Sequence, residues 1–110
     1  MNIQIFGKAK SFDTKKAERY FKERRIKFQS VDIIKYGMSR GEFESVRRAV
    51  GLEAMLDENA KGAELVKYLA YEDDKAEKLL ENQSLIRCPI VRNGREATVG
   101  YCPEIWSTWE

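Results

Sequence analysis

The hydrophobic pattern in the first third of the chain predicts a strand, a helix and a second strand. Ile3–Phe6 is mostly apolar, as expected of a short strand, and Lys27–Ile33 alternates apolar and polar residues imperfectly. Between them, Phe12–Arg25 repeats apolar residues at helical spacing, at Ala17, Tyr20 and Phe21. A right-handed crossover should make the two strands parallel, so the chain begins with a βαβ unit.

The middle of the chain is predicted to be helical. Ser39, followed three residues later by Glu42, forms a capping box for a helix that Gly51 closes. Asp73 and Asp74 suit the N-terminus of a later helix. The apolar stripes expected to face inward are Phe43, Val46 and Val50; Leu65, Val66 and Leu69; and Ala76, Leu79 and Leu80.

The last part of the chain predicts a β-hairpin followed by a short helix. Leu85–Val91 has the pattern of a strand interrupted by one proline, and Glu96–Gly100 is its expected partner. Asn93-Gly94 is the strongest two-residue hairpin signal, and Pro103–Trp106 should begin the final helix. The aromatic residues expected to pack this helix are Trp106 and Trp109.

This order of elements predicts an α/β fold. A βαβ half, a group of helices and a ββα half match a thioredoxin-like four-stranded mixed sheet flanked by helices on both faces. The helices between the two halves form an insert. No linker, repeat or low-complexity segment divides the chain, so residues 1–110 should form a single domain.

The charge balance argues against a polyanionic partner. The 110 residues include 20 basic and 18 acidic ones, for a net charge of +2. The basic runs Lys22–Arg25 and Arg47-Arg48 have acidic neighbours and no interleaved aromatic residues, so we expect solvated helix faces rather than a nucleic-acid site. The chain starts in a strand pattern and has no apolar run of membrane-spanning length, so we expect a cytoplasmic protein without a membrane partner.

The missing residue types limit the candidate chemistry. Histidine is absent, which removes the usual general base and the commonest metal ligand, so no metal site is expected. Cys88 and Cys102 should be reduced thiols. If Asn93-Gly94 forms a two-residue loop, Cys88 faces Val99 on the core side of the hairpin and lies too far from Cys102 for a disulfide.

Ser11 stands where a strand, a short loop and a helix N-terminus are expected to meet. Thioredoxin-like proteins hold a reactive thiolate at such a corner, because the helix dipole and free amides lower the pKa of a cysteine. A serine hydroxyl is a much weaker nucleophile without a nearby base. We therefore interpret Ser11 as a helix N-cap in preference to a catalytic residue, and Asp13 as a helix-end acid.

The sequence resembles, nearly from end to end, the arsenate reductase (ArsC) and Spx family of thioredoxin-like proteins. The order and spacing of four segments carry this resemblance, since none of the segments is specific alone. The segments are Ser11–Ala17, ending Lys15-Lys16-Ala17; Phe28–Ser39, with Val31-Asp32-Ile33; Glu42–Leu56, with Val50-Gly51-Leu52; and Ile86–Tyr101, with Pro89-Ile90-Val91 and Val99-Gly100-Tyr101.

The resemblance implies an active site that this chain lacks. Reductases of the family attack an oxyanion with a cysteine at the position matching Ser11, and Spx-type regulators usually hold a Cys-x-x-Cys pair matching Ser11 and Thr14. Arginines that bind the oxyanion would match positions near Asn59 and at Cys88, and Arg87 is one residue away from the second. The chain would then be a divergent member without the active-site cysteine.

Two functions follow from this interpretation. The first is a non-catalytic module, a pseudo-enzyme that binds or regulates another protein without a cofactor. The second is a thiol-dependent oxidoreductase of arsenate reductase or glutaredoxin type, which uses glutathione or a glutaredoxin and acts through Cys88 as a displaced thiol, or keeps a weak residual activity. An inert, buried Cys88 is the competing interpretation of that residue.

The surface expected to bind a protein partner surrounds the empty nucleophile position. It comprises Lys8, Lys10, Phe12 and Lys15, where an aromatic residue at a helix start has basic neighbours. Alternatively, Phe12 folds back onto the first helix as a hydrophobic staple, and the sequence favours neither arrangement.

Overall fold

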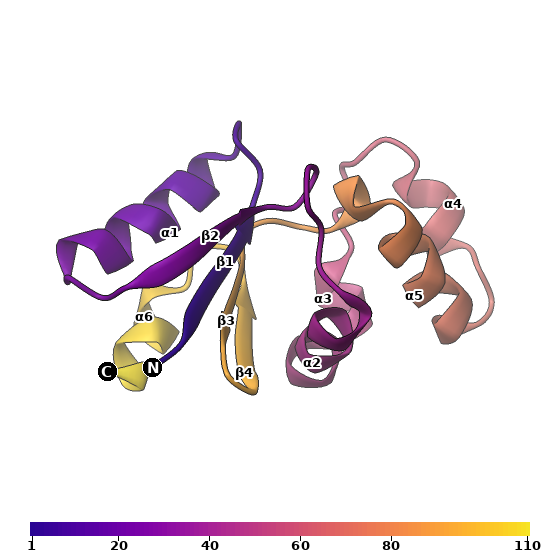
Figure 1. The fold of residues 1–110 in the computed structure, drawn as a ribbon. Helices are drawn as coiled ribbons and strands as arrows, with labels where there is room; N and C mark the ends of the chain where they lie inside the picture. Colours follow the sequence, from indigo (N-terminus) through magenta and orange to yellow (C-terminus); the bar gives the residue numbers. More distant parts are fainter.

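The computed structural model describes residues 1–110 and is built on a four-stranded mixed sheet (Figure 1). The strands are β1 (Ile3–Gly7), β2 (Phe28–Asp32), β3 (Ile90–Asn93) and β4 (Glu96–Val99), in the spatial order β2-β1-β3-β4. β1 and β2 are parallel, and the other two neighbouring pairs are antiparallel. The sheet confirms the predicted α/β, thioredoxin-like fold.

Helices cover both faces of the sheet, and a helical insert extends one side (Figure 1). One face carries α1 (Phe12–Glu23) and α6 (Pro103–Trp106), the latter continued by the 3-10 turn η2 (Ser107–Trp109). The other face carries α2 (Arg40–Val50). The insert adds α3 (Leu52–Met55), α4 (Ala63–Lys67), α5 (Glu72–Glu81) and the 3-10 turn η1 (Gln83–Leu85). None of the helices has the length and apolar character needed to cross a membrane.

The alternation of side chains along β1 separates two hydrophobic cores. Ile3 and Ile5 pack with α1 and with Trp106 of α6, whereas Phe6 belongs to the core on the α2 side. Trp106 is fully buried, and its indole Nε1 donates a hydrogen bond to Thr98 Oγ1 at 2.8 Å. The packing predicted for Trp106 is therefore confirmed, and its polar atom is satisfied.

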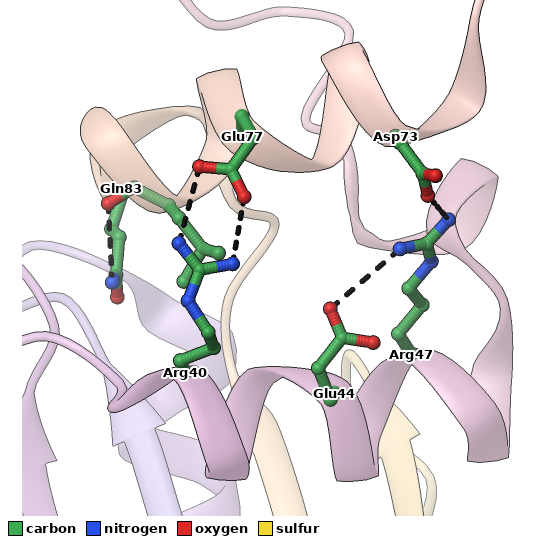
Figure 2. A network of polar contacts seen from close by, with 7 residues as sticks. Arg40, Glu44, Arg47, Asp73, Glu77 and Gln83 are labelled. Atoms are coloured by element: carbon green, nitrogen blue, oxygen red, sulfur yellow. Dashed lines mark hydrogen bonds and ion pairs between the residues drawn. The ribbon is translucent and has the colours of Figure 1, made fainter.

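Ion pairs hold the insert against α2 (Figure 2). Arg40 near the start of α2 makes a two-pronged contact with Glu77 of α5, with the shorter N–O distance at 2.7 Å. One turn from the end of α2, Arg47 reaches Asp73 at 3.2 Å. The hydrogen bond from Arg40 keeps the pKa of the Glu77 carboxyl below its ordinary value. The two helices are thus joined near both ends of their contact.

The third strand begins later than the sequence predicts. Leu85 ends a 3-10 turn, and Ile86 forms an isolated bridge with Leu56. The backbone N–H of Arg87 donates to the carbonyl of Met55 at 2.7 Å, so this segment pairs with the end of α3 instead of the sheet. Pro89 has no N–H for a ladder, and regular pairing starts only at Ile90.

The hairpin register also differs from the prediction. Asn93 still pairs with Ile3 of β1 and with Glu96 of β4, so the turn falls on Gly94-Arg95. The Asn93 side chain also accepts a hydrogen bond from the Asn2 N–H. Val99 consequently pairs with Ile90 and not with Cys88. The shift is two residues, which leaves every side chain on its predicted face. Cys88 therefore still packs against the core on the α2 side.

Two helix predictions need correction. Leu65 was expected to face inward but is 79% exposed, because α4 has only five residues and buries a single narrow stripe of Ala63 and Val66. The first helix ends at Glu23 instead of Arg25, since Arg25 adopts a left-handed backbone conformation with φ of 60°. The capping box of Ser39 and Glu42 is confirmed in full.

Candidate functional site

The loop between β1 and α1 forms a tight corner at the edge of the sheet where the parallel strands end. The Ser11 N–H donates to the carbonyl of Lys8 at 3.0 Å, and the Lys8 N–H contacts Thr14 Oγ1 at 3.4 Å. Gly7 is buried directly beneath Thr14, and a Cβ on Gly7 would lie 2.2 Å from Thr14 Cγ2. Only glycine allows the strand end and the first turn of α1 to approach this closely.

Ser11 is the N-cap of α1. Its backbone is extended, and its Oγ accepts a hydrogen bond from the Thr14 N–H at 3.1 Å. This contact satisfies one of the free amides at the helix start. No carboxylate or amine contacts the hydroxyl, and the chain contains no histidine, so no base is placed to take its proton. The geometry supports a structural role for Ser11.

Cys88 lies near this corner but in an environment that disfavours the thiolate. It is half-buried, precedes the cis-peptide bond to Pro89, and directs its Sγ toward the carbonyl of Ile86 at 3.6 Å. Burial raises the pKa of the Cys88 thiol to about 11, and the nearby charge of Lys8 only partly opposes this effect. At neutral pH the group is a protonated thiol and a poor nucleophile.

Arg87 does not supply a cation to Cys88. Its side chain is exposed, and its charge acts on Cys102, whose pKa is nevertheless raised by burial and by Glu104. The cation that acts on Cys88 is Lys8. Neither cysteine is in a disulfide, and no group of three or more potential metal ligands lies together.

Lys8 links the corner to the segment that precedes β3. Its Nζ donates a hydrogen bond to the carbonyl of Ser84 in η1 at 2.8 Å. The contact joins residues that are 76 positions apart in the chain. Sequence reasoning missed this role, because a lysine in a polar loop carries no signal of a distant backbone partner.

The residues predicted to bind a partner lie on an accessible surface. Phe12 is 81% exposed, so the alternative in which it folds back as a staple is wrong. Lys10 and Lys15 are also exposed, and neither forms an ion pair. Beside them lies a small hollow of about 220 Å³, whose lining includes Gly7, Lys8, Thr14, Lys15 and Asp32.

The chain belongs to the ArsC family, because a sequence model of that family matches residues 6–109. No curated protein sequence matches the chain. The family assignment confirms the resemblance found in the sequence, and it covers both halves of the fold together with the insert.

Solved structures of related proteins have the same fold. An ArsC family related protein from Bacteroides fragilis superposes with a TM-score of 0.85, at 19% identity, over 100% of this chain and 98% of that chain. The arsenate reductase from Vibrio cholerae gives a TM-score of 0.83, at 19% identity, over 96% of this chain and 94% of that chain. The glutaredoxin-like NrdH-redoxin from Escherichia coli matches more weakly, with a TM-score of 0.54, at 13% identity, over 100% of this chain and 96% of that chain. At these identities the likeness establishes the fold alone.

Proposed function

We propose that this protein is a non-catalytic, protein-binding member of the ArsC family, in which Ser11 occupies the position of the family's nucleophilic cysteine. The observation that carries the proposal is the role of Ser11 in the loop between β1 and α1. Ser11 caps α1 through its hydrogen bond with Thr14, without a base nearby. A fold shared with enzymes does not carry their activity when the reacting group is replaced.

The alternative is a thiol oxidoreductase that acts through Cys88. One observation favours it, since Lys8 places a positive charge close enough to lower the pKa of the Cys88 thiol. Burial outweighs that effect and leaves the pKa at about 11. A reactive cysteine needs an accessible and electropositive setting, so we rank this alternative second.

The proposed binding surface is the corner surface, which we define as Lys8, Lys10, Phe12 and Lys15. An aromatic side chain that is 81% exposed has no structural role in the isolated fold but is well suited to anchor an interface. The lysines would speed the encounter with a partner of opposite charge. Lys8 contributes mainly its charge, because its ammonium group is already bonded to Ser84.

An activity assay tests the absence of catalysis. With arsenate, glutathione and a glutaredoxin, turnover by the wild type should not exceed that of buffer. Turnover that is abolished by Cys88→Ala would contradict the proposal in favour of the displaced thiol. Turnover that survives Cys88→Ala would contradict the idea that replacing the family cysteine silences the site.

A capture experiment tests the binding surface. The wild-type protein, immobilised and exposed to a lysate of its host, should retain at least one protein that the Phe12→Ala variant loses. Leu65→Ala is a matched control, because Leu65 is 79% exposed on α4, outside the corner surface. Equal retention by wild type and Phe12→Ala would remove this surface from consideration.

A further inference from the structure

The corner surface continues onto a second loop at the same edge of the sheet. β1 and β2 are parallel, with Gly7 paired to Asp32, so the chain leaves both strands at that edge (Figure 1). The N–H of Ile33 donates to the carbonyl of Gly7 at 2.9 Å and fixes the start of the second loop beside the first. No other element of the chain covers the side chains of Phe12 in the first loop region and Tyr36 in the second, and both side chains are largely exposed.

The second loop presents apolar side chains outward in a defined turn. Asp32 Oδ1 accepts hydrogen bonds from the N–H groups of Ile34 at 2.9 Å and Lys35 at 3.2 Å, and the Tyr36 N–H donates to the Asp32 carbonyl at 2.9 Å. These three bonds hold the turn. Ile34 remains 60% exposed and Tyr36 76% exposed, although each could bury substantial apolar area in a complex.

The lysines at this edge form no ion pairs, in contrast to Arg40 and Arg47 of α2. Arg40 and Arg47 both pair with carboxylates of α5 (Figure 2). The lysines without an ion pair at the edge are Lys8, Lys10, Lys15 and Lys35. The acids at this edge are Asp13, which is exposed, Glu18, which accepts a hydrogen bond from Ser30 and lines the hollow, and Asp32, which accepts hydrogen bonds from two backbone N–H groups but keeps its charge. Four lysines against these three carboxylates leave a small net positive charge at the edge.

We infer that this edge binds an acidic protein segment that carries an exposed aromatic or aliphatic side chain. The inference rests on the proposed function and gives the chemistry of the partner. We call the surface the basic edge and define it as Lys8, Lys10, Phe12, Lys15, Ile34, Lys35 and Tyr36. Carboxylates of the partner would face the unpaired lysines, while its apolar side chain would pack on Phe12 or Tyr36.

The observations favour a protein over the other polyanions. Nucleic acid offers few aliphatic groups to pack on Ile34, and the edge contains no arginine for bidentate phosphate recognition. An anionic bilayer offers both charge and apolar depth, but it presents a smooth surface. The hollow of about 220 Å³ between Lys15 and Asp32 is suited to a single projecting side chain instead.

A titration with synthetic peptides tests the inference directly. The probe is a peptide of about twelve residues, rich in Glu and Asp, with one central Trp, added to the uniformly ¹⁵N-labelled protein. Amide signals of residues 8–15 and 33–36 should shift, and the affinity should fall about tenfold between low and high salt, because screening weakens the exposed charge pairs. A peptide with Gly in place of Trp should bind about tenfold more weakly. A peptide with Lys in place of its acids should not bind.

Matched variants separate charge from shape. Lys10→Glu combined with Lys15→Glu should weaken binding about tenfold, mainly through slower association. Lys27→Glu combined with Lys61→Glu changes the net charge equally, at exposed lysines away from the edge that form no ion pair, and should have little effect. Tyr36→Ala should weaken binding, whereas Tyr71→Ala, at 73% exposure outside the edge, should not.

Several outcomes would overturn the inference. One is an absence of shifts at millimolar peptide, and another is a shift pattern centred outside the basic edge. A third is tighter binding, through the same residues, to vesicles of anionic phospholipid or to single-stranded DNA. Failure here, together with Phe12-dependent capture and no arsenate turnover, would reject the acidic partner and leave the proposed function standing. Turnover that requires Cys88 would reject the proposed function itself.

Discussion

Gly7 at the end of β1 and Thr14 in the first turn of α1 are so close that a Cβ on Gly7 would lie 2.2 Å from Thr14 Cγ2. The same threonine donates its N–H to Ser11 and receives a contact from the Lys8 N–H. Thr14 therefore contacts the end of β1, the loop and the helix cap, through both its side chain and its backbone. The shape of the corner depends on this buried contact between Gly7 and Thr14.

Gly7→Ala should destabilise the protein by roughly 1–3 kcal/mol, because the added methyl group overpacks a buried contact that the backbone cannot relieve cheaply. Urea unfolding measures the change as a lower midpoint with an unchanged slope. Gly41→Ala is the matched control, since nothing lies within 4 Å of a Cβ at this helical position in α2. It should be neutral or stabilising by up to about 1 kcal/mol. Equal midpoints for Gly7→Ala and wild type would show that the corner can widen.

Ser11→Ala should lower the free energy of unfolding by about 1 kcal/mol, since it removes the side-chain acceptor for the Thr14 N–H. Ser11→Asp keeps an acceptor and adds a charge that the helix dipole favours, so it should be close to wild type. Far-ultraviolet circular dichroism during thermal unfolding measures both variants. A Ser11→Ala protein as stable as wild type would contradict the cap assignment.

The fold could be predicted from local patterns because the residues of each element carry the signal for that element. The capping box at Ser39, the spacing in α1 and the Asn93-Gly94 turn signal are all short-range features. The corrections have long-range causes. Ile86 pairs with Leu56 instead of with a strand of the sheet, and Asn93 pairs with Ile3 of β1, so the hairpin turn lies one residue later than predicted.

The features of the candidate site also separate into local ones, which the sequence predicts, and long-range ones, which it does not. Ser11 as an N-cap was readable from the sequence, because serine before an amphipathic stretch has a local physical meaning. The tie between Lys8 and Ser84 and the burial of Cys88 depend on how distant segments meet. Ile34 and Tyr36 were missed as surface residues, although Asp32 before them is a usable turn signal.

Ser11→Cys should place a thiol at the N-terminus of α1 with a pKa below the ordinary value of about 8.5. The helix dipole and the charges of Lys8, Lys10 and Lys15 all favour the thiolate there. Arsenate turnover should nevertheless stay poor, because this chain does not match the two arginines that the family resemblance implies for binding the oxyanion. Loss of one such donor costs about 3 kcal/mol of transition-state stabilisation. Thiolate absorbance near 240 nm against pH measures the pKa, with Cys88 and Cys102 replaced by alanine as background. A thiol that titrates at or above 8.5 would show that this corner does not activate cysteine.

Cys88 should label slowly with a thiol reagent at pH 7, more slowly than Cys102, because its pKa is raised to about 11 by burial.

The raised pKa of Cys88 also makes the free energy of unfolding depend on pH. Folded Cys88 holds its proton more tightly than an unfolded cysteine, whose ordinary pKa is about 8.5. The stability it contributes is therefore complete below that value and is lost as the pH rises toward 11.

A Cys88→Val variant isolates this contribution, because valine has a similar volume and does not titrate. The free energy of unfolding of wild type minus that of the variant, measured in urea at about pH 8 and about pH 10.5, should decrease at the higher pH. Lysines and tyrosines that titrate in the same range affect both proteins and cancel in the difference. A difference that stays constant across this range would mean that the Cys88 thiol is as exposed to water in the folded protein as in the unfolded chain, and the case for an accessible, displaced thiol would have to be reopened.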